Sequence, residues 1–418
     1  MDKLVLEGGR PLVGRIAISG AKNATLPLMC ATLLTRGKNR LKSVPGLRDV
    51  RTMSLLLQRL GAQVKADKGG VIHVDTSQAE GDQCPYDLVK TMRASVLALG
   101  PMVARQGSAR VSLPGGCAIG ERPIDQHLKG LAALGAKIEL ESGYVLAKAK
   151  RLKGADITMD LVTVTGTENL IMAACLAKGE TVIRNAAREP EVVDLAQALV
   201  RAGARIEGAG TATVTIQGVD DLRPLDHRVM ADRIEAGTYM VAAAITKGEL
   251  TLTNAPLEHL TAVVAKLKEA GVRFQKNPQG VVVSARRAPR PVNIITGAYP
   301  GFPTDMQAQF MALMALSTGS CTIQETIFEN RMMHVAELRR MGAEIETTGS
   351  TAMVKGVRKL SGAPVMATDL RASACLVLAG LAAVTPTHIS RVYHIDRGYE
   401  RIDQKLTNAG ATIRRIRE

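Results

Sequence analysis

Apolar and polar residues follow an order that recurs six times along the chain. In each repeat an amphipathic helical pattern ends at a glycine and a short alternating strand follows, as in Leu60-Gly61-Ala62-Gln63-Val64. Glycine is favoured just past a helix C-terminus, where the backbone turns left-handed. We therefore expect a helix to end at each of six glycines, which lie about 70 residues apart: Gly61, Gly135, Gly203, Gly271, Gly342 and Gly410.

A second helical pattern in every repeat is apolar on nearly all faces. A helix of this kind is expected inside a domain, covered on most sides. The chain thus predicts six repeats of about 70 residues, each with two helices and several short strands, and three repeats in each domain. The six apolar patterns cover residues 24–37, 91–107, 167–179, 234–248, 306–319 and 370–384.

The length of 418 residues also favours two domains, because a single hydrophobic core stops growing at roughly 250–300 residues. We expect one domain over residues 22–230, and a second built from residues 1–21 and 231–418. A strand pattern at residues 12–18 belongs to no N-terminal repeat, while the last repeat lacks a final strand. This pattern is therefore expected to complete the second domain.

Composition and charge narrow the class of protein. No apolar run reaches the roughly 18 residues of a membrane span, and the N-terminus lacks a signal-peptide pattern, so we expect a cytoplasmic protein without membrane insertion. The net charge of +15 attracts anions. Nucleic acid is disfavoured because the basic residues are scattered and only 2% of the chain is aromatic. Small polyanionic substrates would account for the positive charge at least as well as nucleic acid would.

The cysteines differ in their surroundings. There is no CxxC pair and no histidine at metal-ligand spacing, so neither a disulfide framework nor a metal site is expected. Cys30, Cys175 and Cys375 lie in apolar helical patterns and are expected in the core. Cys117 instead lies in a loop rich in glycine and proline, with Arg122 nearby. A cation favours the nucleophilic thiolate, although an incidental surface cysteine is the alternative.

Other candidate residues lie in loops or at helix starts. Asp305 and Asp369 each precede a helix and could be simple N-caps, whereas Lys22 and Arg397 could be solvated surface charges. His127 is expected to pack or hydrogen-bond rather than catalyse. Helix N-termini and guanidinium groups together form anion sites, so their accumulation at equivalent ends of the repeats favours a phosphate-bearing ligand.

The chain resembles the UDP-N-acetylglucosamine 1-carboxyvinyltransferase (enolpyruvyl transferase) family over essentially its whole length. The resemblance implies an α/β fold with two inside-out α/β barrel domains of three repeats, and an active site in the cleft between them. The stretches that carry it are SGAKNATLP, PYDLVKTMRAS, LPGGCAIGERPIDQH, NAAREPEVVD, FPTDMQAQF, ENRMMHV, ATDLRASA and YHIDRGYERID.

The activity that the resemblance implies is transfer of the enolpyruvyl group of phosphoenolpyruvate to the 3′-hydroxyl of UDP-N-acetylglucosamine, with release of phosphate. This is the first committed step of peptidoglycan synthesis and so serves cell wall biogenesis, cell shape and division. The family is the target of fosfomycin. No metal or organic cofactor is expected.

The resemblance also implies residue roles. Cys117 is the general acid and the site of a covalent phosphoenolpyruvate adduct, and Asp305 takes the proton from the sugar hydroxyl. Lys22, Arg122 and Arg397 hold phosphoenolpyruvate. The residues implied to hold the UDP-sugar are Asn23, Arg93, Pro123, Ile124, Asp125 and Ile327, and further substrate contacts are expected at Gln126, Arg331, Asp369 and Arg371.

One position departs from the family. Where some members have a lysine near the diphosphate, this chain has Leu161. We expect Thr163 and Thr165 to contact the diphosphate instead.

Two alternatives remain. The related 3-phosphoshikimate 1-carboxyvinyltransferases share the fold but lack the cysteine loop. A basic repeat scaffold that binds nucleic acid would fit the charge alone.

Overall fold

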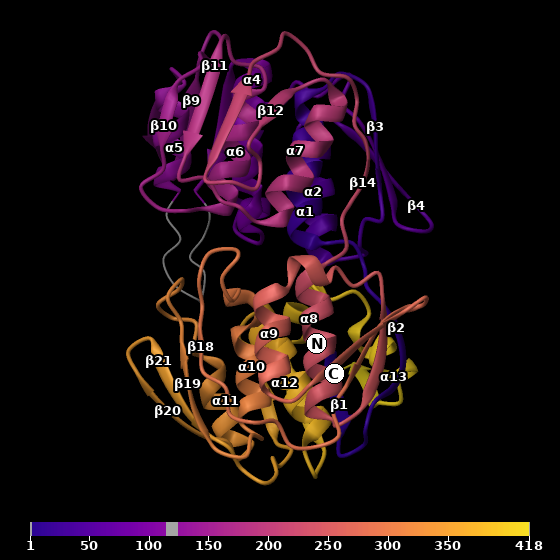
Figure 1. The fold of residues 1–418 in the computed structure, drawn as a ribbon. Helices are drawn as coiled ribbons and strands as arrows, with labels where there is room; N and C mark the ends of the chain where they lie inside the picture. Colours follow the sequence, from indigo (N-terminus) through magenta and orange to yellow (C-terminus); the bar gives the residue numbers. More distant parts are fainter. Residues whose placement is uncertain (1, 114–123, 418) are drawn as a thin grey trace. The chain divides into compact units, whose positions relative to one another are not determined.

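The computed structural model describes residues 2–113 and 124–417, so Cys117, Arg122 and Pro123 lie outside the described residues. The chain forms two compact units (Figure 1). The N-terminal unit contains residues 20–113 and 124–230, and the C-terminal unit contains residues 2–19 and 231–417.

The N-terminal unit alternates strands and helices along the chain. Its helices are α1 (Lys22–Ala31), α2 (Arg48–Arg59), α3 (Tyr86–Val89), α4 (Leu99–Gln106), α5 (Asp125–Ala133), α6 (Val164–Ala174) and α7 (Pro190–Ala202), with the 3-10 helices η1 (Thr32–Leu34) and η2 (Arg93–Ala98). Its strands are β3 (Lys38–Lys42), β4 (Gln63–Asp67), β5 (Val71–Asp75), β6 (Gln83–Cys84), β7 (Ser108–Ser112), β8 (Lys137–Glu141), β9 (Tyr144–Lys148), β10 (Asp156–Thr158), β11 (Glu180–Arg184), β12 (Arg205–Glu207), β13 (Thr213–Gln217) and β14 (Asp226–Arg228).

The C-terminal unit repeats this alternation. Its helices are α8 (Arg233–Ile245), α9 (Thr261–Glu269), α10 (Gln307–Met314), α11 (His334–Arg340), α12 (Leu370–Ala382) and α13 (Ile402–Asn408), with η3 (Leu257–His259), η4 (Thr304–Met306) and η5 (Val392–Arg397). Its strands are β1 (Asp2–Glu7), β2 (Val13–Ala17), β15 (Glu249–Thr253), β16 (Arg273–Asn277), β17 (Gly280–Ser284), β18 (Ile294–Ile295), β19 (Ser320–Gln324), β20 (Glu344–Thr348), β21 (Thr351–Lys355), β22 (Pro364–Met366), β23 (Thr387–Ser390) and β24 (Thr412–Arg417).

Six four-stranded sheets of the described residues share one topology. Their strand orders are β14-β3-β5-β4, β6-β7-β9-β8, β10-β11-β13-β12, β2-β15-β17-β16, β18-β19-β21-β20 and β22-β23-β1-β24. In each order the first pair is parallel and the next two pairs are antiparallel. Three sheets lie in each unit, as the sixfold repeat predicted.

The first two strands of the chain, β1 and β2, each belong to a sheet of the C-terminal unit. The predicted strand at residues 12–18 is β2, and it pairs with β15 of the fourth repeat, Val13 opposite Glu249. The missing strand of the last repeat is instead β1, which lies between β23 and β24. The sequence pattern does not predict β1, because three consecutive apolar residues, Leu4, Val5 and Leu6, give no alternation.

The apolar helices lie inside the sheets, as the inside-out arrangement implies. Every residue of α8 and α10 is buried, and α12 packs against both (Figure 1). In the N-terminal unit α4 and α6 pack together, and α1 contacts α6 and α7. Outer strands such as β4, β8 and β16 are largely exposed. A helix buried on all sides needs no polar face, which explains the low polarity of these patterns.

The six glycines end their helices as predicted. All have φ between +90° and +112°, a conformation that costs a side chain more than it costs glycine. Within residues 2–113 and 124–417 no helix is long and apolar enough to cross a membrane.

Candidate active site

Asp305 lies at the centre of an ionic cluster in the C-terminal unit. Its Oδ1 is 2.7 Å from Nη2 of Arg331, and its Oδ2 is 2.7 Å from Nη2 of Arg371. Both arginine side chains are buried, whereas a quarter of the Asp305 side chain is exposed. The carboxylate thus faces solvent between two fixed cations.

Arg371 is held by a buried network as well as by Asp305. Its Nη1 donates to the Tyr399 hydroxyl at 3.2 Å, which also accepts from Gln309 at 3.1 Å and shares a hydrogen bond with Thr238 at 2.9 Å. Burial alone would lower the pKa of Arg371, but the Asp305 carboxylate, Tyr399 and Asp232 together outweigh burial and raise it. The guanidinium therefore stays charged and oriented.

The two candidate N-cap aspartates have different roles. Asp369 is a true N-cap, since its Oδ1 accepts from the backbone N–H groups of Arg371 and Ala372 at 2.8 and 3.1 Å. Asp305 instead lies inside η4, and the N-cap positions of η4 and α10 are occupied by Pro303 and Met306. The N-cap alternative is therefore confirmed for Asp369 and wrong for Asp305.

A second carboxylate supports the same cluster. Arg331 Nη1 donates to the Thr304 hydroxyl at 2.8 Å, and that hydroxyl donates to Glu325 Oε2 at 2.8 Å. Glu325 Oε1 accepts from the backbone N–H of Ile327 at 2.9 Å. Glu325 thus links the Arg331 guanidinium to the loop that presents the half-exposed Ile327. Arg397 ends η5 of this unit and is partly buried.

In the N-terminal unit the candidate cation Lys22 begins α1, followed by Asn23. The Nζ of Lys22 lies 3.7 Å from Oδ2 of Asp49, a residue in the first turn of α2. The Lys22 side chain is 14% exposed, so it is no freely solvated charge.

A neutral histidine organises the start of α6. Asn169 Nδ2 donates to His127 Nδ1 at 2.9 Å, so the other ring nitrogen carries the hydrogen and donates to the Thr165 hydroxyl at 3.2 Å. Burial, and next the nearby Arg93 charge, lower the pKa of His127 to about 3. The expected packing and hydrogen-bonding role of His127 is confirmed, and the Thr165 O–H remains available to donate to another acceptor.

Gln126 fixes the segment that precedes α6. Its Nε2 donates to Asp125 Oδ2 at 2.8 Å and to Asp160 Oδ2 at 3.0 Å, while its Oε1 accepts from the Asp160 backbone at 2.9 Å. Thr163 caps α6 by accepting from the Gly166 N–H at 3.2 Å. Leu161 is 65% exposed between them. The donors of Gln126 are thus used within the protein, and a substrate contact by this residue stays a prediction.

The five described cysteines are buried, which confirms the core positions of Cys30, Cys175 and Cys375. Burial raises the pKa of Cys84 and Cys175 to about 12. Thiols of this kind react slowly near neutral pH. No cluster of three or more potential metal-ligating side chains occurs in the described part of the chain.

Comparison with known proteins identifies the family. A family model described as EPSP synthase (3-phosphoshikimate 1-carboxyvinyltransferase) matches residues 6–406. UDP-N-acetylglucosamine 1-carboxyvinyltransferase of Geobacter metallireducens is 60% identical over the full length of both chains. The chain belongs to the UDP-N-acetylglucosamine 1-carboxyvinyltransferase family. The enzyme of that name from Thermodesulfovibrio yellowstonii is 54% identical, again over both full lengths.

Solved structures place this family member in the enolpyruvyl transferase fold. The enolpyruvyl transferase NikO from Streptomyces tendae superposes with a TM-score of 0.90 at 26% identity, covering 99% of this chain and 98% of its own. EPSP synthase from Acinetobacter baumannii has a TM-score of 0.75 at 18% identity over both full chains and supports the fold alone.

The predicted site residues of this family member fall into separate groups. Asp305, Arg331 and Arg371 lie together in the C-terminal unit, with Asp369 capping α12 beside Arg371. Asp125 and Gln126 in the N-terminal unit are bonded to each other. Sequence reasoning missed three supporting residues, Asp49, Glu325 and Tyr399, because each acts through a partner distant in the chain.

Proposed function

We propose that the chain transfers the enolpyruvyl group of phosphoenolpyruvate to the 3′-hydroxyl of UDP-N-acetylglucosamine and releases phosphate. The observation that carries this proposal is 54–60% identity, over entire chains, to relatives named for this reaction. The product would enter peptidoglycan synthesis. The proposed contacts come from residues of both units.

The cations suit the donor substrate. Phosphoenolpyruvate carries a phosphate and a carboxylate, so several positive groups must neutralise it. Lys22, Arg122 and Arg397 are proposed to hold the phosphate-bearing molecule, together with Arg331 and Arg371. The latter two are buried, and a guanidinium matches a carboxylate or phosphate through two parallel hydrogen bonds.

Asp305 is proposed as the base that accepts the proton of the 3′-hydroxyl. A carboxylate bound to two guanidinium groups is a weak base, because both cations favour its charged form. An incoming substrate anion competes for Arg331 and Arg371, and drawing either away raises the basicity of Asp305. Donor binding would thereby activate the base.

The covalent steps then balance without a cofactor. The sugar oxygen forms a bond to C2 of phosphoenolpyruvate as Asp305 takes its proton, and Cys117 delivers a proton to C3. Elimination next breaks the C2–O bond to phosphate as the Cys117 thiolate takes a proton back from C3, which restores the double bond as an enol ether. Preorganised charge and general acid–base groups are sufficient for such a reaction.

Phosphate release tests the proposal. We expect the purified chain to release phosphate from phosphoenolpyruvate when UDP-N-acetylglucosamine is present, and mass spectrometry to find the enolpyruvyl ether of that nucleotide sugar. Shikimate 3-phosphate, the acceptor of the related family, should give no release above the acceptor-free control. Release with shikimate 3-phosphate alone would overturn the assignment.

A further inference from the structure

A charged cavity lies in the C-terminal unit, away from the Asp305 cluster. It has a volume of about 510 Å³ and is lined by residues at the C-terminal ends of α8, α10 and α12. Asp305 and Arg371 lie at the opposite, N-terminal ends of α10 and α12. The cavity is therefore separate from the candidate active site.

Four basic residues line this cavity: Arg10, Lys247, Arg358 and Lys359. In the part of the chain that the structure describes, none of these side chains makes an ion pair or a hydrogen bond. No acidic residue is among the lining residues. The four positive charges thus have no protein counterion beside them.

A simpler account is that these cations only offset the three helix ends. The carbonyls there already have backbone donors: Gly248 N–H bonds Ala243 at 2.8 Å, and Gly9 N–H bonds Leu381 at 2.9 Å. Each helix end is equivalent to only about half a negative charge, so three ends cancel less than half of four full charges. The cavity keeps a net positive potential.

Apolar residues form the rest of the wall. Ile245 and Leu381 at the helix ends, with Leu316 just past α10, face the same cavity as the cations. A volume of about 510 Å³ lies within the roughly 300–1,000 Å³ of small-molecule sites. A bare inorganic ion would leave this apolar wall uncovered.

We propose that this cavity binds a small amphiphilic anion, a phosphomonoester that carries an apolar group. The phosphate lies among Arg10, Lys247, Arg358 and Lys359, and the apolar group covers Ile245, Leu316 and Leu381. Arginine and lysine together suit phosphate, since the guanidinium bonds it bidentately and the ammonium acts as a point charge.

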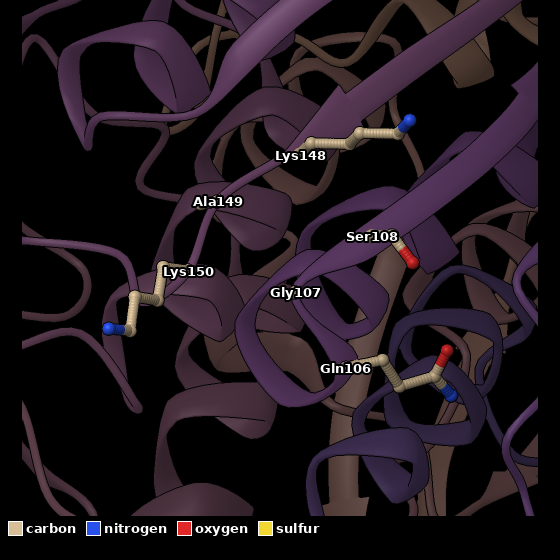
Figure 2. Close-up of a pocket in the computed structure, with 6 residues that line it drawn as sticks. All are labelled: Gln106, Gly107, Ser108, Lys148, Ala149 and Lys150. Atoms are coloured by element: carbon tan, nitrogen blue, oxygen red, sulfur yellow. The ribbon is translucent and has the colours of Figure 1, made fainter.

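The N-terminal unit offers a matched comparison. An open hollow beside the end of α4 is lined by Gln106, Gly107, Ser108, Lys148, Ala149 and Lys150. Figure 2 shows Lys148 and Lys150 extending away from each other. Two cations are thus present, but they do not converge on one ligand.

Isothermal titration calorimetry of the full chain with 1-naphthyl phosphate tests the proposal. Saturating UDP-N-acetylglucosamine, given without phosphoenolpyruvate so that no phosphate is released, should leave this binding unchanged. The double variant Arg358→Gln/Lys359→Gln should weaken it about tenfold, as expected for losing two partly solvated charge contacts. The control Lys148→Gln/Lys150→Gln makes the same change in charge and should alter the affinity less than twofold.

Further ligands test the two parts of the site. Neutral 1-naphthol should not bind, and inorganic phosphate should bind more weakly than 1-naphthyl phosphate. Co-sedimentation with phosphatidic acid vesicles that depends on Arg358 and Lys359 would assign the anion to a lipid head group, and its absence to a soluble molecule. Equal weakening in both double variants, or no binding of 1-naphthyl phosphate, would overturn the proposal. Neither result depends on the catalytic activity.

Discussion

The two units use the same repeat but hold polar groups differently at the N-terminal ends of their buried helices. In the C-terminal unit, Asp305 joins Arg331 and Arg371 in an ionic cluster. In the N-terminal unit, His127 stays neutral and bonds Asn169 and Thr165 at the start of α6. A shared scaffold therefore does not impose a shared chemistry, because the loop side chains decide which ends carry charge.

Replacing Asp305, the central carboxylate, tests the ionic cluster of the C-terminal unit. We expect Asp305→Asn to lower the turnover of phosphate release at least about a hundredfold, as for removal of a general base. It should also lower the free energy of unfolding by about 2 kcal/mol. That is less than the roughly 3–5 kcal/mol for breaking a fully buried pair, because Asp305 is a quarter exposed.

The matched control is Asp226→Asn in the N-terminal unit. Asp226 also binds two cations, Arg40 and Lys42, both at 2.6 Å, but it is 52% exposed. Exposed pairs contribute at most about 1 kcal/mol, so both turnover and urea stability should be nearly unchanged. If Asp305→Asn retained near-normal turnover while staying folded, Asp305 would not be the base.

The neutral His127 of the N-terminal unit predicts that the stability of the fold depends on pH. The pKa of His127 is about 3 in the folded chain and about 6.5 when unfolded. The neutral His127 contributes fully to the free energy of unfolding above about pH 6.5. This contribution is lost as the pH falls, since only the unfolded state takes up the proton. The loss should approach about 1.4 kcal/mol per pH unit and amount to about 2 kcal/mol between pH 7 and 5.

Urea denaturation at pH 7 and pH 5 measures this effect. His127→Gln should be less stable than the wild-type chain at pH 7, and the difference should shrink by about 2 kcal/mol at pH 5. His388→Gln, which replaces an exposed histidine on β23, is the matched control for the loss of a histidine side chain. A constant difference at both pH values would mean that His127 is protonated in the folded chain.

Much of the fold follows from local pattern. Glycine at a helix end and an apolar helix on all faces are properties of a few neighbouring residues, so both could be recognised six times. The strand β1 could not, because its place between β23 and β24 depends on residues at the other end of the chain. Local pattern gives elements but leaves such pairings open.

The resemblance names candidate site residues but not the contacts between them. Asp305 and Asp369 look alike in sequence, since each precedes a helix. What separates them is that Arg331 and Arg371 reach Asp305 from 26 and 66 residues further along the chain. Gln126 likewise binds Asp160, 34 residues away. Such long-range partners carry no signal at the residue itself.

The smallest effect sharpens the distinction between the two aspartates. Asp369→Ala removes the acceptor for the N–H groups of Arg371 and Ala372 and should cost about 1 kcal/mol of stability, as for a lost N-cap. Asp369→Asn keeps an acceptor oxygen and should cost only a few tenths of that. At Asp305 the two replacements should cost nearly the same, because what matters there is the charge. Urea denaturation of the four variants tests this contrast, and an Asn replacement as damaging as Ala at Asp369 would show that charge, not capping, is its main contribution.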